Sequence, residues 1–212
     1  KRKVAKAKKR IAELDMLIKK LYETYAMGKL EEKRFEMLSA EYEKEQDELE
    51  RALASDQAKR LAETIWNDPR LKDKVTAGLF VGEGIDAKEY PRTMGSDHII
   101  ENRDAILDTV PDILLTNFKM LDYGLMRQKF MSLWKGNIET EQKALRFIVL
   151  DELHTYDGAQ GTDVANLIRR LKLKLHIPKG LLCPIGTSAT IGSGSDSKAR
   201  LCEYATNVFG ET

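Results

Sequence analysis

The chain has 212 residues, enough for one domain or for one domain with an appendage. Hydrophobic residues make up 42% and charged residues 33% of the sequence, a balance that suits a soluble protein with a hydrophobic core. The net charge of +1 gives the chain as a whole no marked affinity for polyanions.

Cysteine content and hydropathy argue against several classes of protein. The two cysteines, Cys183 and Cys202, form no CxxC pair, which argues against a zinc ribbon and against a disulfide framework. They favour a reducing compartment, and we expect a cytoplasmic protein. No apolar run is long enough to cross a bilayer, and no signal-peptide core follows the basic start, so we expect no membrane partner.

The first predicted element is a pair of helices. Residues 1–10, KRKVAKAKKR, are almost entirely basic, and form either a solvated helix end or a nucleic-acid contact. Apolar residues then recur in a heptad pattern at Ile11, Leu14, Ile18, Leu21 and Tyr25. Gly28 is well placed to end this helix, and a second series follows at Phe35, Leu38, Tyr42 and Leu49. The pattern predicts an antiparallel helical hairpin, a coiled coil that only packs or mediates self-association.

A family resemblance gives this hairpin a more specific interpretation. The run IAELD…LIKKLYE…GK…RFEMLSAEYE resembles the coiled-coil segment in the C-terminal region of large serine recombinases, over about residues 1–51. In that family the hairpin extends from a DNA-binding zinc ribbon and mediates contacts between recombinase subunits. The ribbon cysteines and the domain with the nucleophilic serine are absent here, so we expect no DNA cleavage.

From Ala52 onward, apolar strand-like runs alternate with helix-like stretches. The runs are VTAGLFVG, DILLTN, RFIVLDE and LLCPIGTSAT, and the helical stretches include ALASDQAKRLAETIW and VANLIRRLKLKL. This alternation predicts an α/β layer structure with a mainly parallel sheet. We therefore expect two domains, a hairpin over 1–51 and an α/β domain over 52–212. No Gly or Pro lies between Leu30 and Trp66, which predicts one continuous helix on the order of 50 Å across the boundary.

The sequence DELH, Asp151 to His154, follows the apolar, β-branched run FIVL. Asp151 is therefore predicted to lie at the carboxyl end of a buried strand, where ligands of open α/β sheets bind. One carboxylate at that edge can hold the Mg²⁺ that accompanies ATP while its neighbour orients a water molecule, roles that suit Asp151 and Glu152 respectively. An acidic pair after a strand also serves as a helix N-terminal cap, and DELH alone does not distinguish the two.

The segment Thr187 to Thr190, TSAT, follows the next apolar run. The order DExH, helix, strand, SAT resembles superfamily 2 helicases, and TNFKML and ALASDQAKRLA resemble the motifs that grip the nucleic-acid backbone in that family. The resemblance implies that Ser188 and Thr190 couple the nucleotide state to the binding of nucleic acid. His154, grouped with Asp151 and Glu152 as a catalytic residue, could relay the nucleotide state to another domain. The resemblance also implies that three residues contact phosphates, namely Gln57, Thr116 and Asn117.

Within that superfamily, DELHTYDGAQGTDVANLIRRLKLKL looks most like the DNA helicases of the Mrf and Hrq type and the helicases of bacterial defence islands. The resemblance runs from about Ala52 to the C-terminus. It implies a partial RecA-like parallel sheet with helices on both faces, an ATP-dependent helicase and hydrolase activity, and ATP and Mg²⁺ as cofactors. It favours DNA as the partner, with RNA as the alternative.

The phosphate-binding loop of such an enzyme, G-x-x-x-x-G-K-[ST], does not occur in the sequence. Gly28-Lys29 is followed by Leu30, and GSGSDSK lacks the Gly-Lys-Ser/Thr ending. We therefore predict a composite of a recombinase-type hairpin and the later part of a first RecA-like domain, either a natural fusion, a recombination scar or a sequence-assembly artefact. In the resembling fold the missing strand lies next to the one that ends in SAT, so we expect an exposed apolar edge at LLCPIG.

Three functions remain open from sequence. The first is a fragment of an ATP-dependent DNA helicase or translocase that is inactive alone. The second is a DNA- or protein-interaction module based on the coiled coil, and the third is a non-functional chimera.

Overall fold

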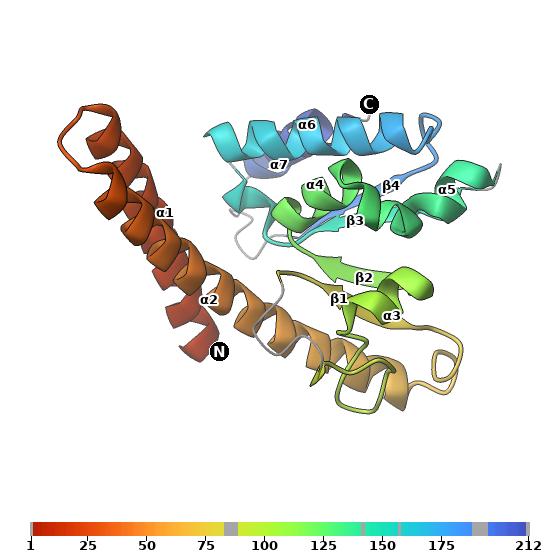
Figure 1. Cartoon of the computed structure of the whole chain (residues 1–212). Coiled ribbons are helices and arrows are strands. Elements are labelled where there is room, and N and C mark those ends of the chain that lie inside the picture. The colour runs from red at the N-terminus through yellow and green to blue at the C-terminus, as the bar shows by residue number, and fades with distance from the viewer. Residues whose placement is uncertain (1, 83–88, 141–142, 157, 188–194, 211–212) are drawn as a thin grey trace. The chain divides into compact units, whose positions relative to one another are not determined.

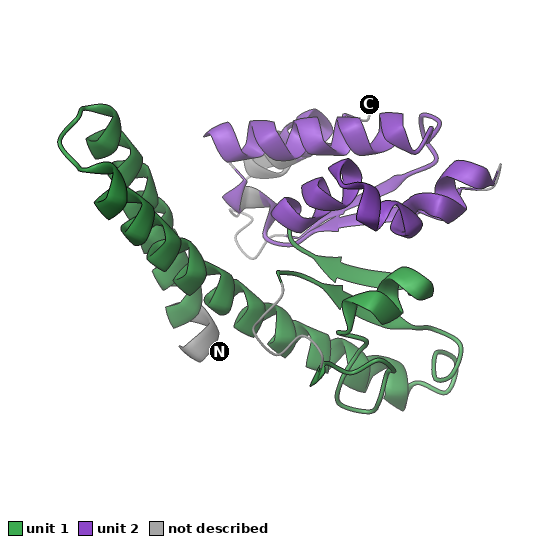
Figure 2. Ribbon diagram, viewed as in Figure 1, with its two compact units in different colours: residues 1–117 green, residues 118–212 purple. Residues whose placement is uncertain are grey.

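The computed structural model describes residues 2–82, 89–140, 143–156, 158–187 and 195–210. The chain divides into two compact units, Lys1–Asn117 and Phe118–Thr212, coloured separately in Figure 2. Helices alternate with short parallel strands in both units, which confirms the predicted α/β class. Within the described residues, no helix is both long and apolar enough to span a membrane.

Unit 1 begins with the predicted helical hairpin (Figure 1). Helix α1 spans Arg2–Ala26 and helix α2 spans Glu32–Asn67. Gly28 ends α1 with a φ of 69°, a left-handed conformation that glycine adopts without a steric penalty. The amide of Lys29 donates to the carbonyl of Thr24 at 3.1 Å and closes this turn. The position of Gly28 therefore sets where the chain reverses.

Polar pairs and buried leucines hold α1 against α2. Leu14 is fully buried, and the guanidinium of Arg10 donates to both carboxylate oxygens of Glu45, at 2.7 and 2.8 Å. The side-chain amide of Gln46, itself buried, donates to the carboxylate of Asp15 at 2.7 Å. These contacts join residues more than thirty positions apart and fix the register of the two helices.

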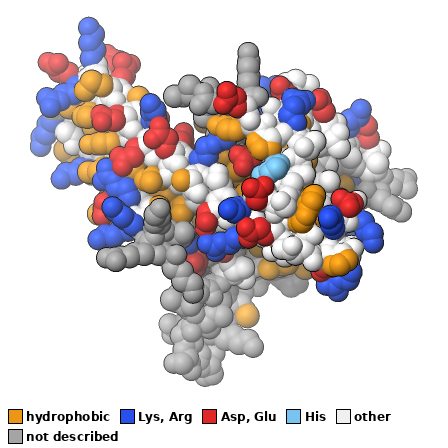
Figure 3. Space-filling model, turned by 90° about the horizontal axis from the view of Figure 1, so that it is seen from below, with side chains coloured by type: hydrophobic (Ala, Val, Ile, Leu, Met, Phe, Trp, Pro, Cys, Tyr) orange, Lys and Arg blue, Asp and Glu red, His pale blue; other side chains and the backbone are white. Residues whose placement is uncertain are grey.

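The outside of the hairpin carries mixed charges with scattered apolar side chains. Figure 3 shows Lys and Arg side chains beside Asp and Glu side chains on this part of unit 1. Large exposed hydrophobic side chains lie among them, Met16, Met27 and Met37. At the tip, the rings of Tyr25 and Phe35 stack with centroids 4.2 Å apart.

Helix α2 continues without a break through the predicted boundary at Ala52. Its 36 residues give a length of about 54 Å at 1.5 Å per residue, as the sequence predicted. Its C-terminal half buries three residues that share one face at helical spacing, Ala58, Ala62 and Ile65. The same helix therefore forms one arm of the hairpin and one layer of the α/β part of unit 1.

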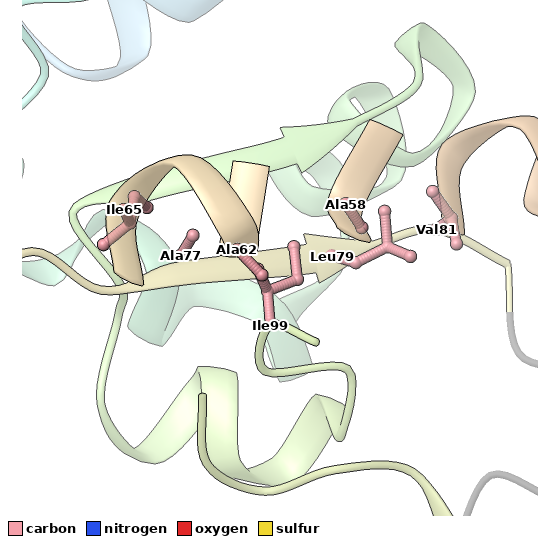
Figure 4. Packing of buried hydrophobic residues seen from close by; sticks show 7 residues of the cluster. All are labelled: Ala58, Ala62, Ile65, Ala77, Leu79, Val81 and Ile99. Atoms are coloured by element: carbon pink, nitrogen blue, oxygen red, sulfur yellow. The ribbon is translucent and has the colours of Figure 1, made fainter. Parts of the chain in front are cut away.

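The sheet of unit 1 consists of β1 (Ala77–Phe80) and β2 (Ile113–Thr116), which pair in parallel, with α3 (Arg103–Asp108) between them in the chain. Leu79 of β1 packs with Ile99 against the buried face of α2 (Figure 4). A Cβ atom at Gly78 would lie 2.8 Å from Pro111 Cγ and 3.3 Å from Ile106 of α3. Strand β1 is therefore covered on both faces, as expected for a parallel sheet.

Unit 2 contains a second parallel pair, β3 (Phe147–Leu150) and β4 (Cys183–Gly186), with α6 (Gly158–Lys174) as the crossover between them. The remaining elements of unit 2 are helices: α4 (Phe118–Met126), the 3₁₀ helix η2 (Gln128–Trp134), α5 (Lys135–Glu139), the 3₁₀ helix η3 (Leu153–Thr155) and α7 (Ser195–Phe209).

The two faces of the β3–β4 sheet differ in burial. Ile148 and Leu150 pack onto a core of Leu153, Val164, Ile168, Val208 and Phe209. The alternate residues point away, and Phe147, Val149 and Ile185 stay 63%, 56% and 41% exposed. Among the described residues, β4 pairs with β3 alone.

Candidate functional site

Asp151 and Glu152 directly follow a strand, as the sequence predicts. Contrary to the prediction, strand β3 is not buried, because its alternate residues Phe147 and Val149 are exposed. Asp151 directly follows β3, because the β-branched run Phe147–Leu150 forms the strand and ends there. Leu150 is in register with Gly186 on the parallel strand β4, so the residues after the two strands meet at one edge of the sheet. That edge brings the DELH segment next to Thr187, the first residue of TSAT.

Four hydrogen bonds join the two segments. The hydroxyl of Thr187 donates to Asp151 Oδ1 at 2.6 Å and accepts from the backbone amide of Glu152 at 3.1 Å. The backbone amide of Thr187 donates to the carbonyl of Leu150 at 3.0 Å, and the amide of Leu153 donates to the carbonyl of Thr187 at 2.8 Å. The Thr187 hydroxyl therefore bridges the side chain of Asp151 and the backbone of Glu152 and fixes their positions relative to each other.

Glu152 has a strained backbone, with φ 52° and ψ 48° in the left-handed region. Such a conformation costs a non-glycine residue roughly 1–2 kcal/mol. The hydroxyl of Thr155 donates to the carbonyl of Glu152 at 2.9 Å and, with the bond to Thr187, offsets this cost. Backbone strain of this kind is common at functional sites, where the surrounding contacts hold it.

The alternative role of the acidic pair as a helix cap is not what the structure shows. Glu152 occupies the N-cap position of the short helix η3, but its side chain makes no capping hydrogen bond. The carboxylate of Asp151 accepts the hydroxyl of Thr187 instead. The Asp151 carboxylate therefore binds at the edge shared by β3 and β4, and the Glu152 side chain does not cap η3.

Sequence reasoning missed Thr187, which is the direct partner of Asp151. It assigned roles to Ser188 and Thr190, and these two residues, like the side chain of His154, lie outside the described residues. The parallel order of the strands could have revealed Thr187, since it is the residue that follows β4 as Asp151 follows β3. A close approach supports this edge: a Cβ atom at Gly186 would lie 2.6 Å from a methyl carbon of Leu153.

Two of the three predicted phosphate contacts, Thr116 and Asn117, lie at the carboxyl end of β2 in unit 1, and the third, Gln57, lies on α2. Thr116 ends β2, and its hydroxyl donates to the carbonyl of Phe80 at 2.7 Å. The side-chain amide of Asn117 donates to Glu50 Oε2 on α2 at 3.1 Å. Gln57 is exposed on α2 about two helical turns after Glu50, so both residues lie on one side of the helix. Helix α2 therefore carries Gln57 and contacts Asn117 through Glu50.

Two arginines also lie at this end of β1, and no sequence motif singled them out. The guanidinium of Arg51 donates to the carbonyl of Gly82 and lies 4.2 Å from the ring centroid of Tyr90. Arg103 donates to the carbonyl of Val81 at 3.0 Å. A cavity of about 90 Å³ lies between these groups.

Comparison with known proteins gives these motifs a family. Residues 50–197 match the profile of DEAD/DEAH box helicases. The chain belongs to the DEAD/DEAH box helicase family. Among curated relatives, Druantia protein DruE of Escherichia coli (strain UMEA 4076-1) is 36% identical over 55% of this chain, and the uncharacterized ATP-dependent helicase YprA of Bacillus subtilis (strain 168) is 32% identical over 68% of it. No solved structure matches the chain significantly.

The chain is short against these relatives of the helicase family. It spans 6% of the length of the Escherichia coli protein and 16% of the Bacillus subtilis protein. The family match begins at residue 50, within α2 and close to the boundary predicted at Ala52. The helicase resemblance is therefore confirmed at the level of the family, and the serine recombinase resemblance of residues 1–51 stays a hypothesis.

Family membership implies ATP and Mg²⁺. The described residues include a suitable ligand for Mg²⁺, but the usual loop for the phosphates of ATP does not occur in the sequence. Asp151 offers the oxygen ligand that Mg²⁺ prefers, and one or two carboxylates usually suffice because the nucleotide phosphates and water complete the shell. Consistent with that, no cluster of three or more metal-ligating side chains occurs in the described parts of the chain. The phosphates lack a partner of the usual kind, since the sequence contains no G-x-x-x-x-G-K-[ST] loop.

Proposed function

We propose that this chain supplies the metal-binding and coupling part of the first RecA-like domain of an ATP-dependent DNA helicase or translocase. Asp151 would hold the Mg²⁺ of bound ATP, and Glu152 would orient the attacking water. His154, close to this pair in the sequence, would relay the nucleotide state to another domain, and Ser188 and Thr190 would couple that state to the binding of nucleic acid. The observation that carries the proposal is the hydroxyl of Thr187 between Asp151 and Glu152 at the edge of β3 and β4.

We further propose that these 212 residues do not hydrolyse ATP by themselves. Backbone amides and a lysine normally surround the phosphates, and without them ATP loses most of its binding groups. In this account the hairpin of residues 1–51 stands where the phosphate-binding strand and helix would precede the ALASDQ motif. The predicted cofactor therefore needs a phosphate-binding segment that another part of a larger protein or another chain provides.

Nucleic acid is the proposed substrate class, with DNA favoured over RNA by the Mrf- and Hrq-type resemblance. Thr116, Asn117 and Gln57 would contact backbone phosphates, because hydroxyl and amide groups bind phosphate without selecting a base. Thr116 and Asn117 are neighbours at the end of β2, and Asn117 contacts α2, the helix that carries Gln57, which supports this assignment.

A graft tests the proposed function. Residues 1–51 would be replaced by a phosphate-binding strand and helix that carry a G-x-x-x-x-G-K-[ST] loop, joined to Ala52 near the start of the family match. We expect the grafted chain to hydrolyse ATP, and Asp151→Asn to lower the rate by on the order of a hundredfold or more, because the metal ligand is lost. Asp163→Asn, an exposed carboxylate on α6, is the matched control and should leave the rate unchanged.

Two results would contradict the proposal. ATP hydrolysis by the folded graft that is insensitive to Asp151→Asn would remove Asp151 from the site. Micromolar affinity of the unmodified chain for Mg-ATP, measured by calorimetry, would show that phosphate binding does not need the missing loop.

A second candidate function is an interaction module, and the ordered hairpin favours it. The two hydrogen bonds between Arg10 and Glu45 hold the helices in one register beside a basic segment, residues 1–10. Salt-dependent DNA binding that disappears when residues 1–10 are deleted would support this function, and dimerisation in analytical ultracentrifugation would support self-association. A non-functional chimera would instead show poor solubility and unfolding without cooperativity.

A further inference from the structure

Two of the residues proposed to contact nucleic acid, Thr116 and Asn117, each donate a hydrogen bond to an acceptor of the protein itself. The hydroxyl of Thr116 has one hydrogen, and it donates to the carbonyl of Phe80. The side-chain amide of Asn117 donates to a carboxylate, that of Glu50, at 3.1 Å. A phosphate that approaches Asn117 therefore meets a negatively charged acceptor already in place.

The position of Glu50 is set by the folded core and not by a mobile loop. It lies on α2, two helical turns before Ala58, which is 1% exposed against β1. The next residue, Arg51, is held through its bond to the carbonyl of Gly82 and its contact with Tyr90. Glu50 is half-buried, and its contact with Asn117 joins positions 67 residues apart in the chain.

We propose that Glu50 is an electrostatic gate at the carboxyl end of β2. Its carboxylate holds the amide of Asn117 and repels the phosphate backbone of a single strand, so nucleic acid binds this end of the sheet only by displacing the contact. The inference rests on the proposed function, because it takes Asn117 as a nucleic-acid contact. Because Glu50 lies on α2, the helix that also forms the hairpin would regulate the contact between Asn117 and nucleic acid.

The expected size of the effect follows from screened Coulomb repulsion. Two unit charges about 6 Å apart near a solvated surface change affinity by roughly three- to tenfold at low ionic strength. Salt shortens the range of the repulsion, so the difference should shrink as salt is raised. Loss of a hydrogen bond without loss of charge would not show this dependence on salt.

The experiment measures binding of a fluorescent oligo(dT) strand to the full chain by anisotropy, at low and at high salt. Glu50→Gln removes the charge and retains an oxygen that accepts from Asn117, and Glu50→Ala removes both. Glu48→Gln is the matched control, because it removes the same charge from an exposed position two residues away on another side of α2. Circular dichroism shows whether each variant keeps its helices.

We expect both Glu50 variants to bind roughly three- to tenfold more tightly than the wild type at low salt, and by a smaller factor at high salt. Glu48→Gln should change affinity much less, and adding Asn117→Ala to Glu50→Gln should abolish the gain. One result would contradict the gate alone: Asn117→Ala lowers the affinity of the chain for the strand, but Glu50→Gln has the same affinity as Glu48→Gln. In that case the proposed contact of Asn117 with nucleic acid is supported and the gate is wrong. If no variant binds the strand, both the gate and the proposed contact fall.

Discussion

Replacing Thr187 by valine should loosen the junction between β3 and β4, because valine keeps the shape of threonine and lacks its hydroxyl. The variant loses a charge-assisted bond to Asp151 Oδ1 at 2.6 Å and a neutral bond from the amide of Glu152 at 3.1 Å. Such bonds contribute about 1.5–3 and 0.5–1.5 kcal/mol respectively. Since Thr187 and Asp151 are exposed, hydrogen bonds to water replace part of the lost contribution. We therefore expect the free energy of unfolding of unit 2 to fall by about 1–2 kcal/mol.

The two tryptophans allow this loss to be measured in unit 2 alone. Trp134 is 6% exposed in unit 2 and donates to the carbonyl of Gly124 at 2.7 Å, whereas Trp66 belongs to unit 1. In a Trp66→Phe background, urea unfolding followed by Trp134 fluorescence reports the free energy of unfolding of unit 2. Thr206→Val is the control, because its hydroxyl bonds only locally, to the carbonyl of Cys202 on α7. An equal effect of Thr187→Val and Thr206→Val would refute the reasoning.

Three further predictions concern packing, strain and pH. Ala62→Leu should lower the free energy of unfolding by about 1–3 kcal/mol in urea titrations, because Ala62 is fully buried, whereas Ala40→Leu on the exposed side of α2 should be nearly neutral. Glu152→Gly should stabilise unit 2 by up to about 1 kcal/mol in the same assay, because glycine tolerates a φ of 52°; destabilisation would contradict the strain. The hydrogen bond from Arg10 lowers the pKa of Glu45 from its ordinary value of 4.5. The ion pair therefore stabilises the fold fully above pH 4.5, and this stabilisation is lost as pH falls through the lowered pKa of Glu45. The difference in melting temperature between wild type and Glu45→Gln should therefore vanish in acid.

The fold class followed from the sequence because local patterns determine it. The apolar runs at 77–80 and 147–150 form strands, and the alternation of strands with helices gives parallel pairs. Because β3 and β4 are parallel neighbours, the residues that follow them, Asp151 and Thr187, meet at one edge. The absence of Gly and Pro after Leu30 likewise predicted the continuous helix α2.

Other features depend on contacts that no local pattern encodes. The bond between Glu50 and Asn117 joins distant positions, and only the register of α2 on β1 brings them together. The left-handed backbone of Glu152 runs against the preference of its side chain and reflects its tertiary partners. The roles of Ser188, Thr190 and His154 stay predictions from the family resemblance, as do the domain boundary at Ala52 and the recombinase-like origin of the hairpin.

The junction of DELH with TSAT can be observed directly by NMR through the hydrogen bond from the amide of Leu153 to the carbonyl of Thr187, 2.8 Å long. A long-range HNCO spectrum detects scalar coupling between the amide nitrogen and the carbonyl carbon across such a bond. We predict a cross-peak between the Leu153 amide and the Thr187 carbonyl. A cross-peak from Leu153 to the carbonyl four residues earlier would instead place DELH within a helix, and would contradict the helicase-type site.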